Sequence, residues 1–205
     1  RHTRLLTVTG VQTCALPILL WNVFSTGLSH AGDSMIANSN IIKKIYFPRL
    51  IIPMSAILVS VFDFLMAFIV YIGILIFYHQ TVNPLIAVFL PASLLITVIT
   101  CFGLGTLLSA MNVKYRDFRY ALPFIIQILM FVSPVIYSPQ FSQQWAKIVM
   151  SINPMCGAIS LLRFCITGVQ PDMLMIAISC VSSVLLLLIG LSYFRKTESY
   201  FADLA

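Results

Sequence analysis

The feature that most constrains the fold is a long stretch without a charged side chain, which runs from Phe64 to Val113. One crossing of a bilayer takes about 20 apolar residues, so this stretch is long enough for two. Only 9% of the whole chain is charged, whereas a soluble domain carries about a quarter. Inside a bilayer only helices or closed barrels satisfy the backbone, and these runs are too long and uniform for barrel strands. The sequence therefore predicts an all-α, polytopic membrane protein.

Four apolar runs predict membrane-spanning helices, namely Ile51–Tyr78, Leu85–Met111, Tyr120–Tyr137 and Met173–Phe194. A fifth run, Leu19–Met35, carries polar residues at intervals, and it predicts an amphipathic or channel-facing helix that does not face lipid. The fold class is thus about five visible spans, and the Gly103 and Gly105 pair predicts close helix contacts near the end of the second strong span.

Basic residues gather in three segments, Asn38–Leu50, Asn112–Arg119 and the tail after Phe194. These segments hold eight of the twelve Lys and Arg residues, and alternate crossings place all three on one side. The opposite segments, His79–Pro84 and Ser138–Asp172, hold only Lys147 and Arg163. Cytoplasmic loops carry the excess of Lys and Arg, so the three basic segments are predicted to be cytoplasmic.

The outer segment Ser138–Asp172 is too long for a turn and too apolar for a solvated loop, so we expect a re-entrant helical hairpin before the last span. Gln143–Ile152 has helical periodicity. Asn153 and Pro154 then predict an N-cap and a first helical residue, and Gly168 predicts the end of the second helix.

The first residues differ from the rest. Val11–Ile18 (VQTCALPI) reads as the in-frame translation of a common sequencing-library adapter. Residues 1–18 are therefore expected to be an artefact or a non-native stretch, and residues 19–205 the transmembrane domain. The alternative is a native polar N-terminus.

The sequence contains no recognisable motif for binding a nucleotide, a metal ion or a nucleic acid. No GxxxxGK[ST] phosphate loop occurs, so this chain is not expected to bind ATP. The five cysteines show no CxxC or Cys/His spacing, so no metal site is expected, and a disulfide between Cys156 and Cys165 is disfavoured because both fall on one helix. The basic residues form no face interleaved with aromatics, so no nucleic-acid partner is expected.

Three stretches resemble the permease subunits of polysaccharide-exporting ABC transporters, which export O-antigen, capsule or teichoic acid chains. They are Asn38–Pro53 (NSNIIKKIYFPRLIIP), Asn112–Asp117 (NVKYRD) and Ser133–Tyr137 (SPVIY) followed by Asn153-Pro154-Met155. The tail Tyr200–Asp203 adds to the likeness, which covers Leu19 to Ala205. It departs at the front, where the family has an interface helix and a first span. That departure predicts a truncated six-span protein.

The resemblance implies a homodimer that forms a channel in the bacterial cytoplasmic membrane. A separate ATP-binding subunit, which holds ATP and Mg, would dock beneath it, so no cofactor is expected on this chain. The substrate would be a lipid-linked glycan, and membrane lipids would surround the complex.

The two cytoplasmic loops carry the candidate coupling residues, Lys43, Lys44, Tyr46, Phe47, Pro48, Arg49, Tyr115, Arg116 and Asp117. One interpretation is that they contact the ATPase, and the other is that the basic ones only anchor the topology. Both interpretations hold together if a short docked helix also has apolar anchors such as Ile42.

The candidate channel or gate residues are Asp63, Trp145, Asn153, Pro154 and Arg163. An ionised carboxylate in the middle of a span costs at least a few kcal/mol, so Asp63 is expected to face a hydrated path or a partner, or else to stabilise helix packing. Trp145 and Trp21 fall near the outer side, where interface anchoring competes with contact to a sugar.

Three rival functions remain open. A drug or lipid ABC exporter would share the architecture. A membrane-embedded glycosyltransferase would need a polar catalytic pair at an interface, where the outer segment offers Arg163 and Asp172. An ion-coupled carrier would need several buried charges.

The charge asymmetry predicts the sidedness of three engineered cysteines. Ser39→Cys and Asp117→Cys should react with an impermeant thiol reagent only from the cytoplasm, and Gln143→Cys only from outside. Opposite labelling at any one of the three positions would contradict this topology.

Overall fold

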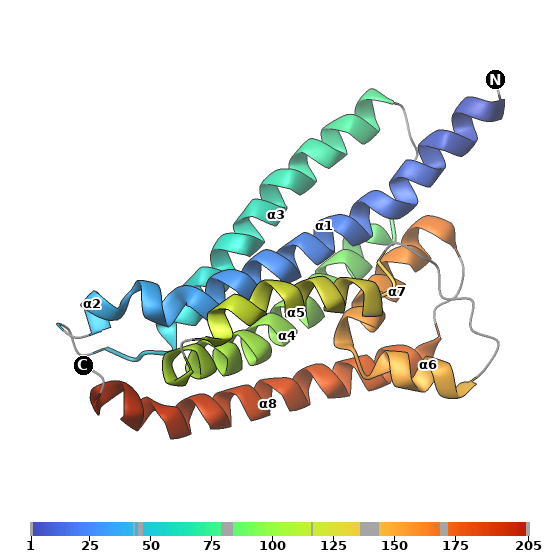
Figure 1. Ribbon diagram of the computed structural model, residues 1–205. Coiled ribbons are helices and arrows are strands. Elements are labelled where there is room, and N and C mark those ends of the chain that lie inside the picture. The colour runs from blue at the N-terminus through green and yellow to red at the C-terminus, as the bar shows by residue number, and fades with distance from the viewer. Residues whose placement is uncertain are drawn as a thin grey trace.

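The structure is a computed structural model that describes residues 2–42, 44, 47–78, 84–115, 117–135, 144–168 and 172–203. Side chains are described for residues 15–42, 44, 47–78, 84–115, 117–135, 147–165, 168 and 172–198. The described elements are all helices (Figure 1): α1 (His2–Ala37), α2 (Ser39–Ile42), α3 (Ile51–Phe77), α4 (Ile86–Lys114), α5 (Phe118–Val132), α6 (Gln144–Ser151), α7 (Pro154–Thr167) and α8 (Met173–Asp203).

The prediction of an all-α polytopic membrane protein is confirmed. Within the described residues, three helices are long and apolar enough to cross a membrane, and they are Ile51–Phe77, Ile86–Lys114 and Met173–Glu198. Helix α5 is shorter, with 15 residues and a rise of about 22 Å. The two helices expected between residues 138 and 172 are present as α6 and α7.

Helix α1 is amphipathic, as predicted. Leu20, Phe24 and Leu28 are buried in the main core, whereas Asn22 and His30 are exposed. The helix runs without a break through residue 18, so the boundary expected there stays a prediction.

The interpretation of Trp21 as an interface anchor is wrong. Its side chain is 7% exposed and packs against Phe24 with 5.1 Å between ring centroids. The reason is tertiary, because α1 packs against α3, α4 and α7 and Trp21 lies on the face that these helices cover.

Helix α4 occupies the centre of the bundle and presents a face of small residues. A Cβ on Gly103 would lie 2.6 Å from the backbone nitrogen of Leu187 in α8, and a Cβ on Gly190 would overlap the carbonyl oxygen of Gly103. On the other side, a Cβ on Gly105 would lie 2.7 Å from that of Ala31 in α1. Small residues let helices approach closely in membranes, so the close contacts predicted for Gly103 and Gly105 are present.

Residues that lie far apart in the sequence meet at one end of the bundle, which we call the basic end. It holds α2, the loop after it, the α4–α5 connection and the last turns of α8 (Figure 1). Arg49 Nη1 donates a hydrogen bond of 2.6 Å to the carbonyl oxygen of Glu198. A second apolar cluster is formed by Met35, Ile52, Ala110 and Phe194. The three segments predicted to share one side of the membrane therefore do lie together.

Three predicted boundaries differ from the structure. Helix α5 ends at Val132 and not at Tyr137, because Ser133 precedes a proline and takes an extended conformation (ψ 137°). The loop expected at Asn112–Arg119 is shorter, since α4 continues to Lys114 and α5 begins at Phe118. Helix α8 continues past Phe194 to Asp203.

The α4–α8 contact predicts a large difference between two Gly→Ala substitutions. Gly190→Ala should destabilise the protein by about 1–3 kcal/mol, because its methyl group collides with backbone that cannot move aside. Gly73→Ala in α3 is the matched control, since a Cβ there meets nothing within 4 Å. Thermal unfolding of the detergent-solubilised protein measures both. Equal unfolding temperatures for the two variants would contradict the close contact.

Candidate functional site

The start of α7 is built as the sequence predicts. Asn153 has extended backbone angles (φ −76°, ψ 113°), and its side chain accepts a hydrogen bond of 3.1 Å from the nitrogen of Met155. Pro154 follows as a residue of the first helical turn, where its missing N–H costs nothing. At the other end, Gly168 takes a left-handed conformation (φ 69°) and ends the helix.

The α6–α7 hairpin contacts the turn that follows α5. This turn, Ser133–Val135, is called the outer turn below, and all three of its residues are buried. The Nδ2 atom of Asn153 donates a hydrogen bond of 2.8 Å to the Oγ atom of Ser133. One side chain therefore caps α7 with its oxygen and holds the outer turn with its nitrogen.

Arg163 holds the same turn from the middle of α7. Its Nη2 atom donates a hydrogen bond of 3.1 Å to the carbonyl oxygen of Val135. A cation beside the C-terminal end of a helix also interacts favourably with the helix dipole, and Val135 lies just past the end of α5. Asn153, Pro154 and Arg163 are thus brought together at the outer turn, while the side chain of Trp145 lies outside the described residues.

A second set of polar contacts joins the hairpin to α8, and sequence reasoning missed it. Ser179 of α8 is fully buried, and its Oγ atom donates to the carbonyl oxygen of Ser151 at 3.1 Å. The Ser179 Oγ atom also accepts a hydrogen bond of 3.1 Å from the backbone nitrogen of Gly157. A Cβ on Gly157 would overlap Ser179. The available signal was a glycine inside a helical pattern, which often marks a close approach.

The first turn of α7 consequently has every backbone donor satisfied. Pro154 has none, Met155 and Cys156 donate to the side chain and carbonyl of Asn153, and Gly157 donates to Ser179. A helix start buried inside a protein needs this complete set of partners.

At the basic end, the candidate coupling residues separate into inner and outer sets. Lys44 and Pro48 are exposed, Phe47 is half-buried against the second apolar cluster, and Arg49 is occupied by the carbonyl of Glu198. Lys43, Tyr46 and Arg116, which were also predicted to couple, lie outside the described residues. Tyr115 and Asp117 are exposed in the short α4–α5 connection.

The α4–α5 connection is tied to α1 by polar residues that the sequence analysis did not single out. Asn112 is fully buried and its Nδ2 atom donates a hydrogen bond of 2.8 Å to the carbonyl oxygen of Gly32. Arg119 Nε lies 3.3 Å from Oδ1 of Asp33, with 56% and 35% of the two side chains exposed. Asn112 is the first residue of the NVKYRD stretch and Arg119 lies two residues beyond its end, so that stretch was their available signal.

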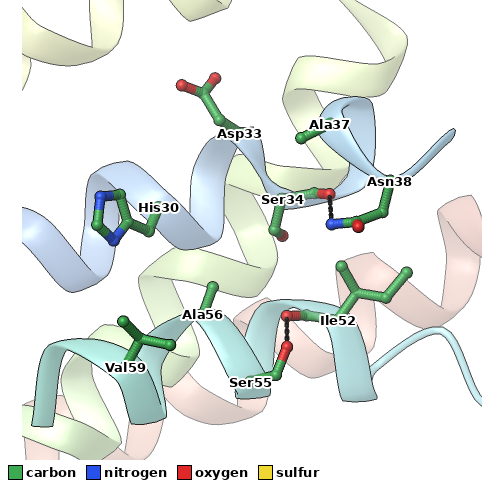
Figure 2. Close-up of a pocket in the computed structure, with 9 residues that line it drawn as sticks. All are labelled: His30, Asp33, Ser34, Ala37, Asn38, Ile52, Ser55, Ala56 and Val59. Atoms are coloured by element: carbon green, nitrogen blue, oxygen red, sulfur yellow. Dashed lines mark hydrogen bonds between the residues drawn. The ribbon is translucent and has the colours of Figure 1, made fainter. Parts of the chain in front are cut away.

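A pocket of about 370 Å³ lies between α1 and α3 near the basic end. Figure 2 shows that His30 and Ser34 line it from α1, Asn38 from the turn after α1, and Ser55 and Ala56 from α3. The Asp33 carboxylate points away from α3, towards the ion pair with Arg119. The pocket is therefore polar on its α1 side.

Asp63 lies in the middle of α3 and is exposed. Around it Val59, Phe62 and Met66 are also exposed. Within the described part of the chain no hydrogen bond or ion pair engages its carboxylate. Both interpretations of Asp63, a hydrated path or partner and a role in helix packing, stay predictions.

The sequence profile of ABC-2 type transporters, the membrane components, matches residues 10–167, which is well over half of the chain. The chain belongs to this family. The match includes the outer turn, the hairpin and most of the basic end, and it begins inside the stretch 1–18 that was expected to be non-native.

Individual relatives of this ABC-2 permease carry more specific names. It is 26% identical over 184 residues to the O-antigen export system permease protein RfbA of Klebsiella pneumoniae, with 90% of this chain and 71% of the relative covered. It is 22% identical over 193 residues to the protein of the same name from Myxococcus xanthus, with 91% of this chain and 72% of the relative covered.

Membership of the family establishes the class of protein. The chain is a multi-pass membrane permease, and the family implies a transporter with an ATP-binding partner. Cys101, Cys156, Cys165 and Cys180 are free thiols, and no cluster of metal-ligating side chains occurs among the described residues.

The double role of Asn153 predicts a graded effect of three substitutions. Asn153→Ala should cost about 2 kcal/mol, because it loses the helix cap and the bond to Ser133. Asn153→Ser keeps a capping oxygen but is too short to reach Ser133, and Ser133→Ala removes that bond from the other side, so each should cost about 1 kcal/mol.

A thiol-reactive dye reports unfolding, because Cys101 and Cys156 are fully buried in the folded protein. The midpoint should fall furthest for Asn153→Ala and by a similar, smaller amount for the other two variants. A Ser133→Ala midpoint equal to that of the unchanged protein would show that the Asn153–Ser133 bond does not hold the outer turn.

Proposed function

We propose that this ABC-2 permease forms the channel of an ATP-driven exporter that moves a lipid-linked polysaccharide, of the O-antigen, capsule or teichoic acid type, across the bacterial cytoplasmic membrane. The observation that carries the proposal is that two relatives of this chain are named as O-antigen export permeases and align with about nine-tenths of it. The residues of the three resembling stretches also fall at the two ends of the bundle, where a motor and an exit gate are needed.

The basic end supports docking of a motor. Lys44, Pro48, Tyr115 and Asp117 are exposed there, while Arg49 and Phe47 attach the same loops to the bundle. A coupling surface requires exposed side chains on loops that are firmly attached to the helix bundle. ATP and Mg²⁺ would bind to the separate ATPase subunit, and this chain would supply the surface that its movement pushes.

The polar face of α1 supports a hydrated path. Asn22, Thr26 and His30 follow one another at helical spacing and lie on the less buried side of the helix. In a lipid environment such side chains face water or protein. We propose that a second copy of the permease completes the channel, and that the hydroxyl-rich glycan passes between the copies.

The rival functions receive less support. A drug or lipid exporter of the same family would share every feature of the fold, and only the names of the relatives favour a glycan. A membrane-embedded glycosyltransferase needs a catalytic pair, but Arg163 binds the Val135 carbonyl and Asp172 pairs with Lys147 at 3.3 Å. Those two side chains are therefore engaged with different partners.

The test of the proposal is ATP-dependent export by the permease reconstituted with its ATPase subunit. Arg116→Lys should insert normally, because Lys and Arg count alike for topology, but it should lower export and transport-linked ATP hydrolysis at least tenfold. The physical reason is that a lysine does not reproduce the forked contact of a guanidinium with a carboxylate or phosphate.

Lys114→Arg is the matched control for that variant. Lys114 is exposed two residues away and stacks over Tyr115 at 5.3 Å, and its replacement keeps the charge of the loop. Full activity of Arg116→Lys would show that Arg116 serves only as a topology anchor. No ATP-dependent glycan export by the unchanged complex would refute the proposed cargo.

A further inference from the structure

Helix α5 is less deeply buried than the helices around it. Within α5, all of whose residues are described, Leu122 is the only buried side chain. Phe124, by contrast, is 68% exposed. The helix packs against α1 and, more sparsely, against α4, with Leu122 seated over Gly32. Four half-buried side chains of α5 also pack against the main core, and they are Phe118, Ile126, Leu129 and Met130. The apolar contacts of α5 are thus mostly partly exposed, and such contacts resist displacement less than fully buried ones.

Both ends of α5 are held by polar contacts. At the basic end, Arg119 pairs with Asp33 of α1 across 3.3 Å. At the other end, Ser133 accepts from Asn153 and the carbonyl of Val135 accepts from Arg163. The two hydrogen bonds at the outer turn are directional and short in range, so a small displacement of the turn breaks both. The ion pair at the basic end weakens gradually with distance, and Val135 is also buried in the main core.

The hairpin is attached to α8 much more firmly than to α5. Met155, Cys156, Ala158 and Ile159 of α7 are fully buried. Ser179 bridges the last residue of α6 to the first turn of α7, and Gly157 leaves no space between α7 and α8. Helix α8 is itself seated on α4 at Gly103 and Gly190. Interiors packed this closely do not deform continuously, so α4, α6, α7 and α8 form one body.

The chain connects α5 directly to the loop at the basic end. Only residues 115–117 separate α4 from α5, and Tyr115 and Asp117 are exposed there. Because the connection is only three residues long, a push on it reaches the first turn of α5 directly. The outer turn lies at the opposite end of the same helix.

From these contacts we propose that α5 is the lever that carries motion from the motor to the exit. In this proposal, which rests on the proposed export function, α5 moves against the body of α4, α6, α7 and α8. The exit opens where the outer turn leaves Asn153 and Arg163. Ser179 is the positioning residue that keeps the hairpin with α8 during this movement.

Two crosslinks test the proposal in the complete transporter with its ATPase subunit. The background has Cys14, Cys101, Cys156, Cys165 and Cys180 replaced by alanine, and a short bifunctional thiosulfonate reagent joins the engineered pairs. The pair Ser133→Cys with Asn153→Cys spans the boundary that moves. The pair Ser151→Cys with Ser179→Cys lies inside the rigid body and is the matched control.

Crosslinking Ser133→Cys to Asn153→Cys should lower export at least tenfold, and reduction of the crosslink should restore it. Crosslinking Ser151→Cys to Ser179→Cys should leave export within twofold of the same variant before crosslinking. Normal export through the first crosslink would overturn the proposal, and so would an equal block by both. Single-cysteine variants treated with the same reagent separate crosslinking from simple modification.

A second measurement does not depend on the cargo. A non-hydrolysable ATP analogue should slow crosslinking of the Ser133–Asn153 pair at least fivefold and leave the Ser151–Ser179 pair unchanged. Unchanged rates for both pairs would refute the lever even if export is observed. A selective change without glycan export would support the lever and refute only the proposed cargo.

Discussion

The structure depends on how closely helices approach α4. In a bilayer, helices gain no hydrophobic free energy by leaving lipid for one another, so association rests on van der Waals packing and hydrogen bonds. Gly103 lets α8 approach α4 closely at Gly190, and Gly105 lets α1 approach it closely at Ala31. The hydroxyl groups of Ser93, Thr97 and Thr100 on the same helix bond to carbonyls of its own backbone. These three side chains therefore keep α4 narrow while their hydroxyl groups remain hydrogen-bonded.

From this centre the contacts spread outwards in a clear order. Helix α8, seated on α4, carries Ser179, and Ser179 organises the start of α7. Helix α1 presents Gly32 to Asn112 and Asp33 to Arg119. Apolar close packing fixes the long helices. At both ends of the bundle, polar contacts add to apolar ones, which are the second apolar cluster at the basic end and the burial of Val135 at the outer turn.

Those parts of the fold that depend on local sequence were predictable. Hydropathy located α3, α4 and α8, and charge placed their basic ends together. The Asn153-Pro154 pair and Gly168 marked both ends of α7 because capping is decided within a few residues. The early end of α5 was missed, although Pro134 contains its cause: the residue before a proline leaves the helical region.

The parts that depend on distant segments were not predictable from one sequence. Trp21 was assigned to an interface because it falls near the outer side, but three other helices cover its side of α1. The sequence alone indicates a surface charge at Arg49, and only the structure shows that its guanidinium binds the carbonyl of Glu198. Ser179 stands among similar small residues, and only the position of Gly157 shows that it bridges two helices. Each of these roles is set by a partner more than 20 residues away.

The length of α5 has a consequence for the surrounding lipid. Its 15 residues rise about 22 Å, whereas the hydrocarbon core of a bilayer is about 30 Å thick. Where its exposed face meets lipid, the bilayer has to thin by several ångströms or the helix has to shift along the membrane normal. Each ångström of mismatch costs a fraction of a kcal/mol. The acyl-chain length of the host membrane therefore acts on α5, a helix with one fully buried side chain.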